Sequence, residues 1–194
     1  LIAALENGDL TQGQQTWGIW ALGQMGAKDP VIGSWLTSIA ANDRAKLNLR
    51  IQALRILTNW VRDGDKTDPL PDVVVTLLTD TAPRLRLEAI QAIWQANQTH
   101  LVGHLIDWLP HEKDRLNYYS AWGALRDLTN VSYRKSLLKD NRPAVRLAAL
   151  LGLFERFKIT LEEALAIAEK ETDPQVQQWI TTWALNPTPP KKMP

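Results

Sequence analysis

The chain has 194 residues, 45% of them apolar and 22% charged, and 22 basic against 21 acidic side chains leave a net charge of +1. This composition fits one or two globular domains, excludes an intrinsically disordered chain and disfavours a nucleic-acid partner, because a phosphate-binding surface shows as an excess of Lys and Arg. The sequence has no Cys, which excludes disulfides, thiolate metal sites and thiol catalysis, and it has no apolar run of about 18 residues that would predict membrane insertion.

Both ends of the sequence suggest a piece of a longer protein. Leu1–Leu5 has the composition of the middle of an apolar helix, and residues 186–194 contain four prolines in nine positions. A proline-rich stretch favours extended, polyproline-like backbone. We therefore expect residues 1–185 to form a domain cut from a larger chain and residues 186–194 to be a linker or tail.

A short motif recurs along the chain at intervals typical of helical repeats. Arg50–Leu54, Arg86–Ile90 and Arg146–Leu150 each begin with Arg and carry Ala at the fourth position. Weaker copies put Trp17, Ala121 and Ile180 in this Ala slot. The six slots (17, 53, 89, 121, 149 and 180) are 36, 36, 32, 28 and 31 residues apart. These spacings predict a repeat of two helices.

Apolar residues around each slot follow the period of an α-helix. In the second repeat this apolar stripe is wide enough to pack against two neighbours, with Leu49, Ala53, Ile56, Leu57 and Trp60. Shorter apolar segments precede the slot helices, at Val31–Ala40, Pro71–Leu78, Leu101–Leu109, Val131–Leu138 and Leu161–Ala168. We therefore expect an all-α chain of helical hairpins. Its core should contain Trp17, Trp20, Trp60 and Trp183.

Two of the predicted turns resemble those of a known family. Asp80–Ala89 and Asp140–Ala149 resemble the inner turn of HEAT-like repeats, in which an Asp and an Arg six positions later form a ladder along the turns. The resemblance implies a right-handed α-solenoid of about six hairpins. It also implies a structural ladder in which Asp80 pairs with Arg86 and Asp140 with Arg146. Arg44 stands where the second repeat would need its Asp, so the ladder should be broken there.

A second resemblance implies an alternative context. Trp17–Gly23 is similar to the helical-repeat region of large bacterial secreted dehydrogenase-like proteins, in which a propeller domain precedes the repeats and a cytochrome c domain follows. By this likeness the chain would position redox domains in a secreted or periplasmic protein. The 194 residues themselves contain no haem-attachment motif and no propeller signature.

The candidate binding residues lie at the positions of the second helices that should face away from the core. In a solenoid these positions, one before, two after and six after the slot, line the concave surface. They include Gln52, Arg55, Asn59, Glu88, Gln91, Gln95, Asp127 and Glu155, and Trp179 adds an exposed aromatic near the proline-rich end. Such a mixed polar row suits a protein or peptide better than phosphate. The alternatives are a merely solvated face and a tail folded over Trp179.

Two chemical functions are weaker alternatives. His100, His104 and Asp107 would share one face of a helix and could hold a metal ion, or they belong to a solvated polar face. Nine tryptophans also fit a HEAT-like DNA glycosylase for alkylated bases, although a near-neutral chain lacks the basic groove that such an enzyme needs. The sequence favours a non-catalytic interaction or spacer scaffold without a cofactor. Its partner would be a protein, a peptide or an adjacent domain of the same chain.

Overall fold

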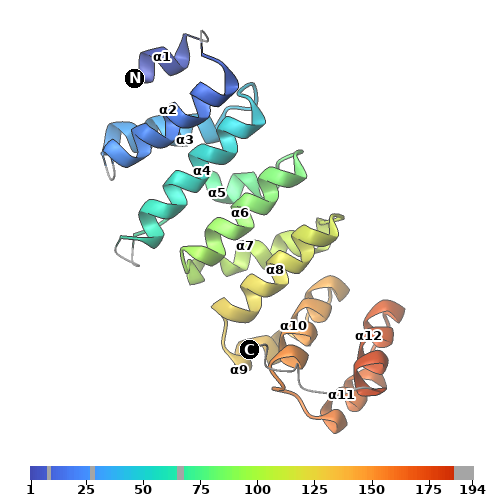
Figure 1. The fold of residues 1–194 in the computed structure, drawn as a ribbon. Helices are drawn as coiled ribbons and strands as arrows, with labels where there is room; N and C mark the ends of the chain where they lie inside the picture. The colour runs from blue at the N-terminus through green and yellow to red at the C-terminus, as the bar shows by residue number, and fades with distance from the viewer. Residues whose placement is uncertain (8–9, 27–28, 65–67, 186–194) are drawn as a thin grey trace. The chain divides into compact units, whose positions relative to one another are not determined.

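The computed structural model describes residues 1–7, 10–26, 29–64 and 68–185, and all regular structure in these residues is helical (Figure 1). The prediction of an all-α chain is confirmed. The chain divides into two compact units, Leu1–Leu101 and Val102–Pro194, where the sequence predicted one domain over residues 1–185. Each unit is built from three pairs of helices.

The first unit contains six α-helices and one 3₁₀ turn in its described residues. The second helices of its three pairs, α2, α4 and α6, pack side by side in chain order, while α3 and α5 pack on α4 and α6 and contact each other. The bounds are Ile2–Glu6 (α1), Gln12–Met25 (α2), Pro30–Ala41 (α3), Leu47–Arg62 (α4), Val73–Leu77 (α5), Pro83–Gln95 (α6) and Thr99–Leu101 (η1).

The second unit repeats this arrangement. Its second helices α8, α10 and α12 again pack in chain order, and α7, α9 and α11 pack on them as the first helices of each pair. The bounds are Val102–Trp108 (α7), Leu109–His111 (η2), Arg115–Leu128 (α8), Val131–Leu137 (α9), Pro143–Glu155 (α10), Leu161–Ala168 (α11) and Pro174–Leu185 (α12).

Helix starts follow from local chemistry that the sequence shows. Proline opens α3, α6, α10 and α12, where its missing N–H costs no hydrogen bond. The Asp29 carboxylate accepts hydrogen bonds from the first amides of α3, and Thr160 and Glu163 form a reciprocal capping box at the start of α11. Thr99, by contrast, opens a 3₁₀ turn instead of an α-helix.

Five of the six predicted slot residues are buried. Ala53, Ala89, Ala121, Ala149 and Ile180 have no exposed surface. The slot assigned to the first repeat was wrong, because Trp17 is 79% exposed and Ile19, two residues later, takes the buried position. Gly23 lies one turn further along, where α2 meets α4 so closely that an added Cβ would lie 2.6 Å from Cγ2 of Ile56.

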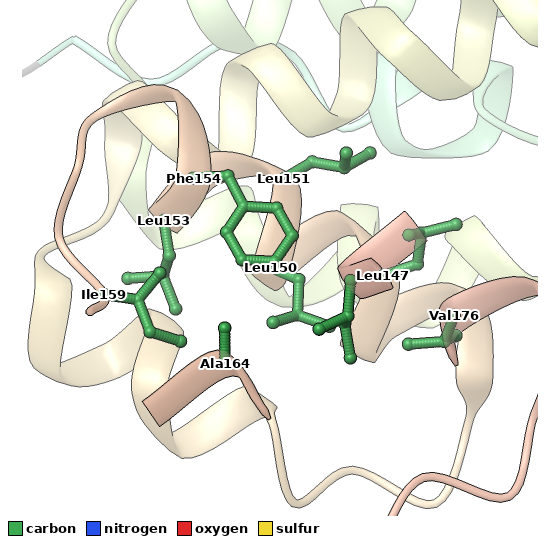
Figure 2. Close-up of a cluster of buried hydrophobic side chains, with 9 residues drawn as sticks. Leu147, Leu150, Leu151, Leu153, Phe154, Ile159, Ala164 and Val176 are labelled. Carbon is green, nitrogen blue, oxygen red and sulfur yellow. The ribbon is translucent and has the colours of Figure 1, made fainter. Parts of the chain in front are cut away.

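The other tryptophans predicted in the core lie at its edge. Trp20 and Trp60 are half-buried, and their indole N–H groups donate to the Gln52 side chain at 2.9 Å and to the Gly23 carbonyl at 3.0 Å. In the second unit, α10 supplies most of a core cluster that Ile159, Ala164, Val176 and Ile180 complete (Figure 2). Trp183 stacks on Phe154 at the edge of this cluster, with ring centroids 4.3 Å apart.

Candidate binding surfaces on the second helices

The polar row predicted on the first unit lines a depression. This depression has a volume of about 470 Å³, opens over α2, α4 and α6, and is lined by Trp20, Arg55, Asn59, Glu88, Gln91 and Gln95, among others. We call it the polar depression. Five of its lining residues are among the candidate binding residues that the helical period had put on the side away from the core.

Glu88 is held at the floor of the polar depression. Its side chain is only 10% exposed, and its carboxylate accepts hydrogen bonds from Arg55 Nε at 2.9 Å and Arg55 Nη2 at 2.5 Å. Arg84 adds a contact at 3.2 Å, and the hydrogen bond to Glu88 raises the pKa of Arg55. The Glu88 carboxylate is therefore already hydrogen-bonded to two arginines of the same chain. The other polar groups of the depression are the side-chain amides of Asn59, Gln91 and Gln95, and Gln95 Nε2 donates to Gln91 Oε1 at 3.2 Å.

Gln52 does not face outward as predicted. It is buried, accepts the Trp20 indole N–H and donates to Asn48 Oδ1 at 3.1 Å. The physical reason is that a second helix packs against second helices on both sides, so the position before the slot faces a neighbour. For the same reason Glu88 and Ala148, each one position before its slot, are buried. The last position of the row is exposed at Gln95, Asp127 and Glu155 and half-buried at Asn59.

Asp127 and Glu155 lie in an arginine network. Arg126 contacts Asp127 at 2.7 Å and Glu155 at 2.5 Å, and Arg156 contacts Asp127 at 2.8 Å. The hydrogen bond from Arg126 lowers the pKa of Asp127 to about 2. These side chains join the C-terminal ends of α8 and α10, which is a structural role, and a ligand would have to compete with the arginines for them.

An aromatic cleft is the second hollow on the second helices. It has a volume of about 520 Å³ and lies among the N-terminal halves of α8, α10 and α12. Its apolar and aromatic lining includes Tyr118, Tyr119, Leu147, Leu151 and Trp179. Its polar lining includes Arg115, Asp173 and Gln175. We call it the aromatic cleft. Trp179 is 37% exposed here, and it is the single lining residue that the sequence predicted as a binding residue.

The tyrosines of the aromatic cleft are fixed by their neighbours. The Tyr118 hydroxyl donates to the Ala144 carbonyl at 2.8 Å, and burial raises the pKa of this phenol. Tyr119 meets Tyr118 and Trp122 edge to face, and the Arg115 guanidinium lies 5.6 Å from the Tyr119 ring centroid. Rings held in this way offer apolar contact area at little cost in side-chain entropy. The sequence does contain a signal for this cleft: Tyr118 stands where the motif has Arg elsewhere, and a second tyrosine, Tyr119, follows it.

The ladder residues connect consecutive helix pairs. Arg86 donates to the main-chain carbonyl of Asp80 at 2.9 Å, whereas the Asp80 carboxylate accepts from Arg50 of the preceding pair at 2.7 Å. Arg50 therefore takes part in the ladder, although its own repeat has Arg44 in the Asp position.

The same pattern holds in the second unit. Arg146 donates to the Asp140 carbonyl at 2.8 Å and pairs with Glu171 of the following pair at 2.6 Å. The Asp140 carboxylate pairs with Arg142 at 2.9 Å. In both turns expected for the ladder, the Arg donates to the main-chain carbonyl of the Asp six residues earlier.

The weak metal candidate receives no support from the geometry. His100 lies in the 3₁₀ turn η1 and not on the helix that carries His104 and Asp107. The Asp107 carboxylate accepts from Arg142 at 2.9 Å. Among the residues that the structure describes, no three His, Cys, Asp or Glu side chains are grouped closely enough to hold a metal ion.

Comparisons with known proteins leave the family open. Neither a scan against protein-family models nor a search of curated proteins finds a match for this chain. In the described part of the chain, no helix is both long enough and apolar enough to cross a membrane.

Proposed function

We propose that the chain is a non-catalytic protein-interaction module. It is an α-solenoid of about six HEAT-like hairpins, and the surface of its second helices binds polypeptide, either from a partner protein or from an adjacent domain of the same protein. Solenoids use the surface formed by one helix of each repeat in this way.

The observation that carries the proposal is that both hollows described above open on second helices. The polar depression offers amide groups on α4 and α6, and the aromatic cleft offers aromatic rings on α8 and α12. Amides can donate to and accept from an extended main chain, and half-exposed aromatic rings are typical anchors of protein contacts. Each of the two surfaces by itself suits polypeptide, the first through polar and the second through apolar contacts.

Selection from a phage-displayed library of random peptides against the 194-residue chain tests the proposal. We expect enriched peptides whose affinity falls about tenfold or more in Trp179→Ala or Gln91→Ala, since a tenfold loss is the size of one good contact. Trp17→Ala and Gln178→Ala are the matched controls, because both remove exposed side chains outside the two hollows. Enriched peptides that are insensitive to both test variants, or no enrichment at all, would overturn the proposal.

A further inference from the structure

We propose that the outer face of α2 binds a second copy of this chain, so that the protein forms a weak dimer through two antiparallel α2 helices. The outer face consists of six exposed residues of α2: Gly13, Gln14, Trp17, Ala21, Gln24 and Met25. The inference is independent of the proposed function, because this face belongs neither to the polar depression nor to the aromatic cleft. A dimer carries each of those surfaces twice and therefore binds a bivalent partner with higher avidity.

The other sides of α2 already have neighbours within the chain. On one side the Asn48 side-chain amide of α4 donates to Thr16 Oγ1 at 2.9 Å. On another, a Cβ added at Gly18 would lie 2.9 Å from Cδ2 of Leu5 in α1. The outer face lies between these two contacts around the helix, and its residues are spaced so that they form one continuous stripe. Neither α1 nor α4 covers this stripe.

The composition of α2 is that of a helix packed on both sides. Trp17 is 79% exposed and Met25 is 81% exposed, opposite the side that buries Ile19 and Leu22. None of the 14 residues of α2 is charged, in a chain in which 22% of residues are. A helix that faces water usually carries charged residues on its exposed side. Since α2 has none, two copies of its outer face can meet without repulsion and without burying an unpaired charge.

The order of large and small residues favours a second copy as the occupant. The outer face is symmetric about position 19, because its residues form three pairs at equal distances from that position: Trp17 with Ala21, Gln14 with Gln24, and Gly13 with Met25. When two identical helices pack antiparallel about a two-fold axis, residues at equal distances on either side of the middle meet. Trp17 of each copy then faces the small Ala21 of the other, and the Met25 end of each helix lies against the Gly13 end of the other.

The area of the outer face sets the strength of the dimer. Two copies of the Trp17 side chain supply about 300–400 Å² of contact surface, and the two Met25 side chains and the glutamine amides beside them add to it. A specific interface buries at least about 1,000 Å² in total. Two single helices reach the low end of that range, so we expect a dissociation constant on the order of 10 μM or more. Well below that concentration the chain is a monomer and the outer face meets water.

Sedimentation equilibrium of the 194-residue chain over about 1–500 μM tests the dimer, because this range spans the expected dissociation constant. In the parent chain we expect the mass to rise with concentration from 21.9 kDa towards twice that value. Trp17→Ala should weaken dimerisation at least about tenfold, the size of a lost hot-spot contact. Leu116→Ala is the matched control, because it removes a side chain that is 61% exposed on α8, and it should dimerise as the parent does.

Exchanging the two central residues tests the antiparallel pairing. Ala21→Trp alone sets a Trp against Trp17 of the other copy and should weaken the dimer at least about tenfold, because the contact is overfilled. The double variant Trp17→Ala with Ala21→Trp again pairs a Trp with an Ala, so its dissociation constant should return to within about threefold of the parent value. Circular dichroism of the dilute monomers checks that each variant is folded.

Three results would overturn the proposal. A parent chain that stays monomeric over the whole range would mean that no second copy binds the outer face, which would then be left to a different protein. A dimer that Trp17→Ala leaves unchanged would place the contact elsewhere on the chain. A double variant that dimerises no better than Trp17→Ala alone would contradict the antiparallel pairing of Trp17 with Ala21.

Discussion

Alanine in the repeat slot determines how closely two second helices approach. Ala89 has no exposed surface and lies in α6, which packs against α4. Ala89→Leu adds three carbon atoms to a filled contact, so we expect a loss of about 1–3 kcal/mol in the free energy of unfolding. Urea unfolding followed by circular dichroism measures it.

Ala21→Leu is the matched control for this prediction. Ala21 is exposed on α2, so the same added atoms meet water there. A surface change of this kind should stay within about 0.5 kcal/mol. Equal stabilities of the two variants would contradict the role assigned to the slot.

Glu171 gives the chain a pH-dependent contribution to stability. Its carboxylate is almost fully buried against Arg146, and the hydrogen bond from Arg146 lowers its pKa. A lowered folded pKa stabilises the protein above the ordinary Glu pKa of about 4.3, and the contribution is lost as the pH falls through the folded value. We expect Glu171→Gln to lower the free energy of unfolding by about 2 kcal/mol at pH 7, the scale of a charge-assisted hydrogen bond.

The pH profile distinguishes a lost charge from lost packing. The deficit of Glu171→Gln should shrink as the pH is lowered below about 4.3, because the parent carboxyl then becomes neutral too. Glu169→Gln, at an exposed position of the same turn, should match the parent at every pH. A deficit for Glu171→Gln that does not change with pH would mean that the charge is not responsible.

At the scale of the elements, arginines tie the second helix pair to the third and, in the second unit, each pair to the next. The Arg50–Asp80 pair is 8% and 13% exposed on its two side chains. Breaking a buried pair by removing one partner leaves an uncompensated charge, so Arg50→Met should cost about 3 kcal/mol. The exposed Arg62–Asp63 pair (43% and 64%) is the control, and Arg62→Met should cost less than about 0.5 kcal/mol.

A double-mutant cycle checks the assignment of this pair. Arg50→Met combined with Asp80→Asn should cost less than the sum of the two single changes, because the second change removes the stranded charge. Strict additivity would show that Arg50 stabilises the chain through its other contact, the hydrogen bond to the Ala40 carbonyl, and not through Asp80.

The sequence predicted those elements whose signal is local. Helix starts at Pro30 and Thr160 and the buried Ala slots follow from capping chemistry and the helical period. The first slot was misassigned because α2 buries Gln15 and Gly23 beside Ile19 and Leu22. With a polar residue and a glycine on the buried side, the largest apolar residue, Trp17, was taken for core.

The candidate site was predictable only in part, for a geometrical reason. A helical period separates the core side of a helix from the opposite side, but it does not show that Gln52 and Glu88 face a neighbouring second helix. The position six after the slot was placed correctly at Gln95. Tyr118 and Tyr119 were missed because the aromatic cleft is formed by residues from three helices and the preceding turn, which no single helical period reveals.

At the scale of the whole molecule, two units of the same construction carry surfaces of different chemistry. The polar depression of the first unit offers amides, and the aromatic cleft of the second offers aromatic rings. A further depression lies between the first helices α9 and α11. Its lining mixes charged and apolar residues and includes Lys135, Leu138, Ile159 and Glu163. We propose that polypeptide binds on the second helices and not on this first-helix surface.

Hydrogen–deuterium exchange of the full chain, with and without the tightest peptide from the displayed library, tests this placement most directly. Binding slows the exchange of amides in the contacted turns, since opening then requires release of the ligand. The account predicts protection in α4 and α6 or in the N-terminal halves of α8 and α12. Protection confined to α9 and α11, or no change at saturating peptide, would contradict it.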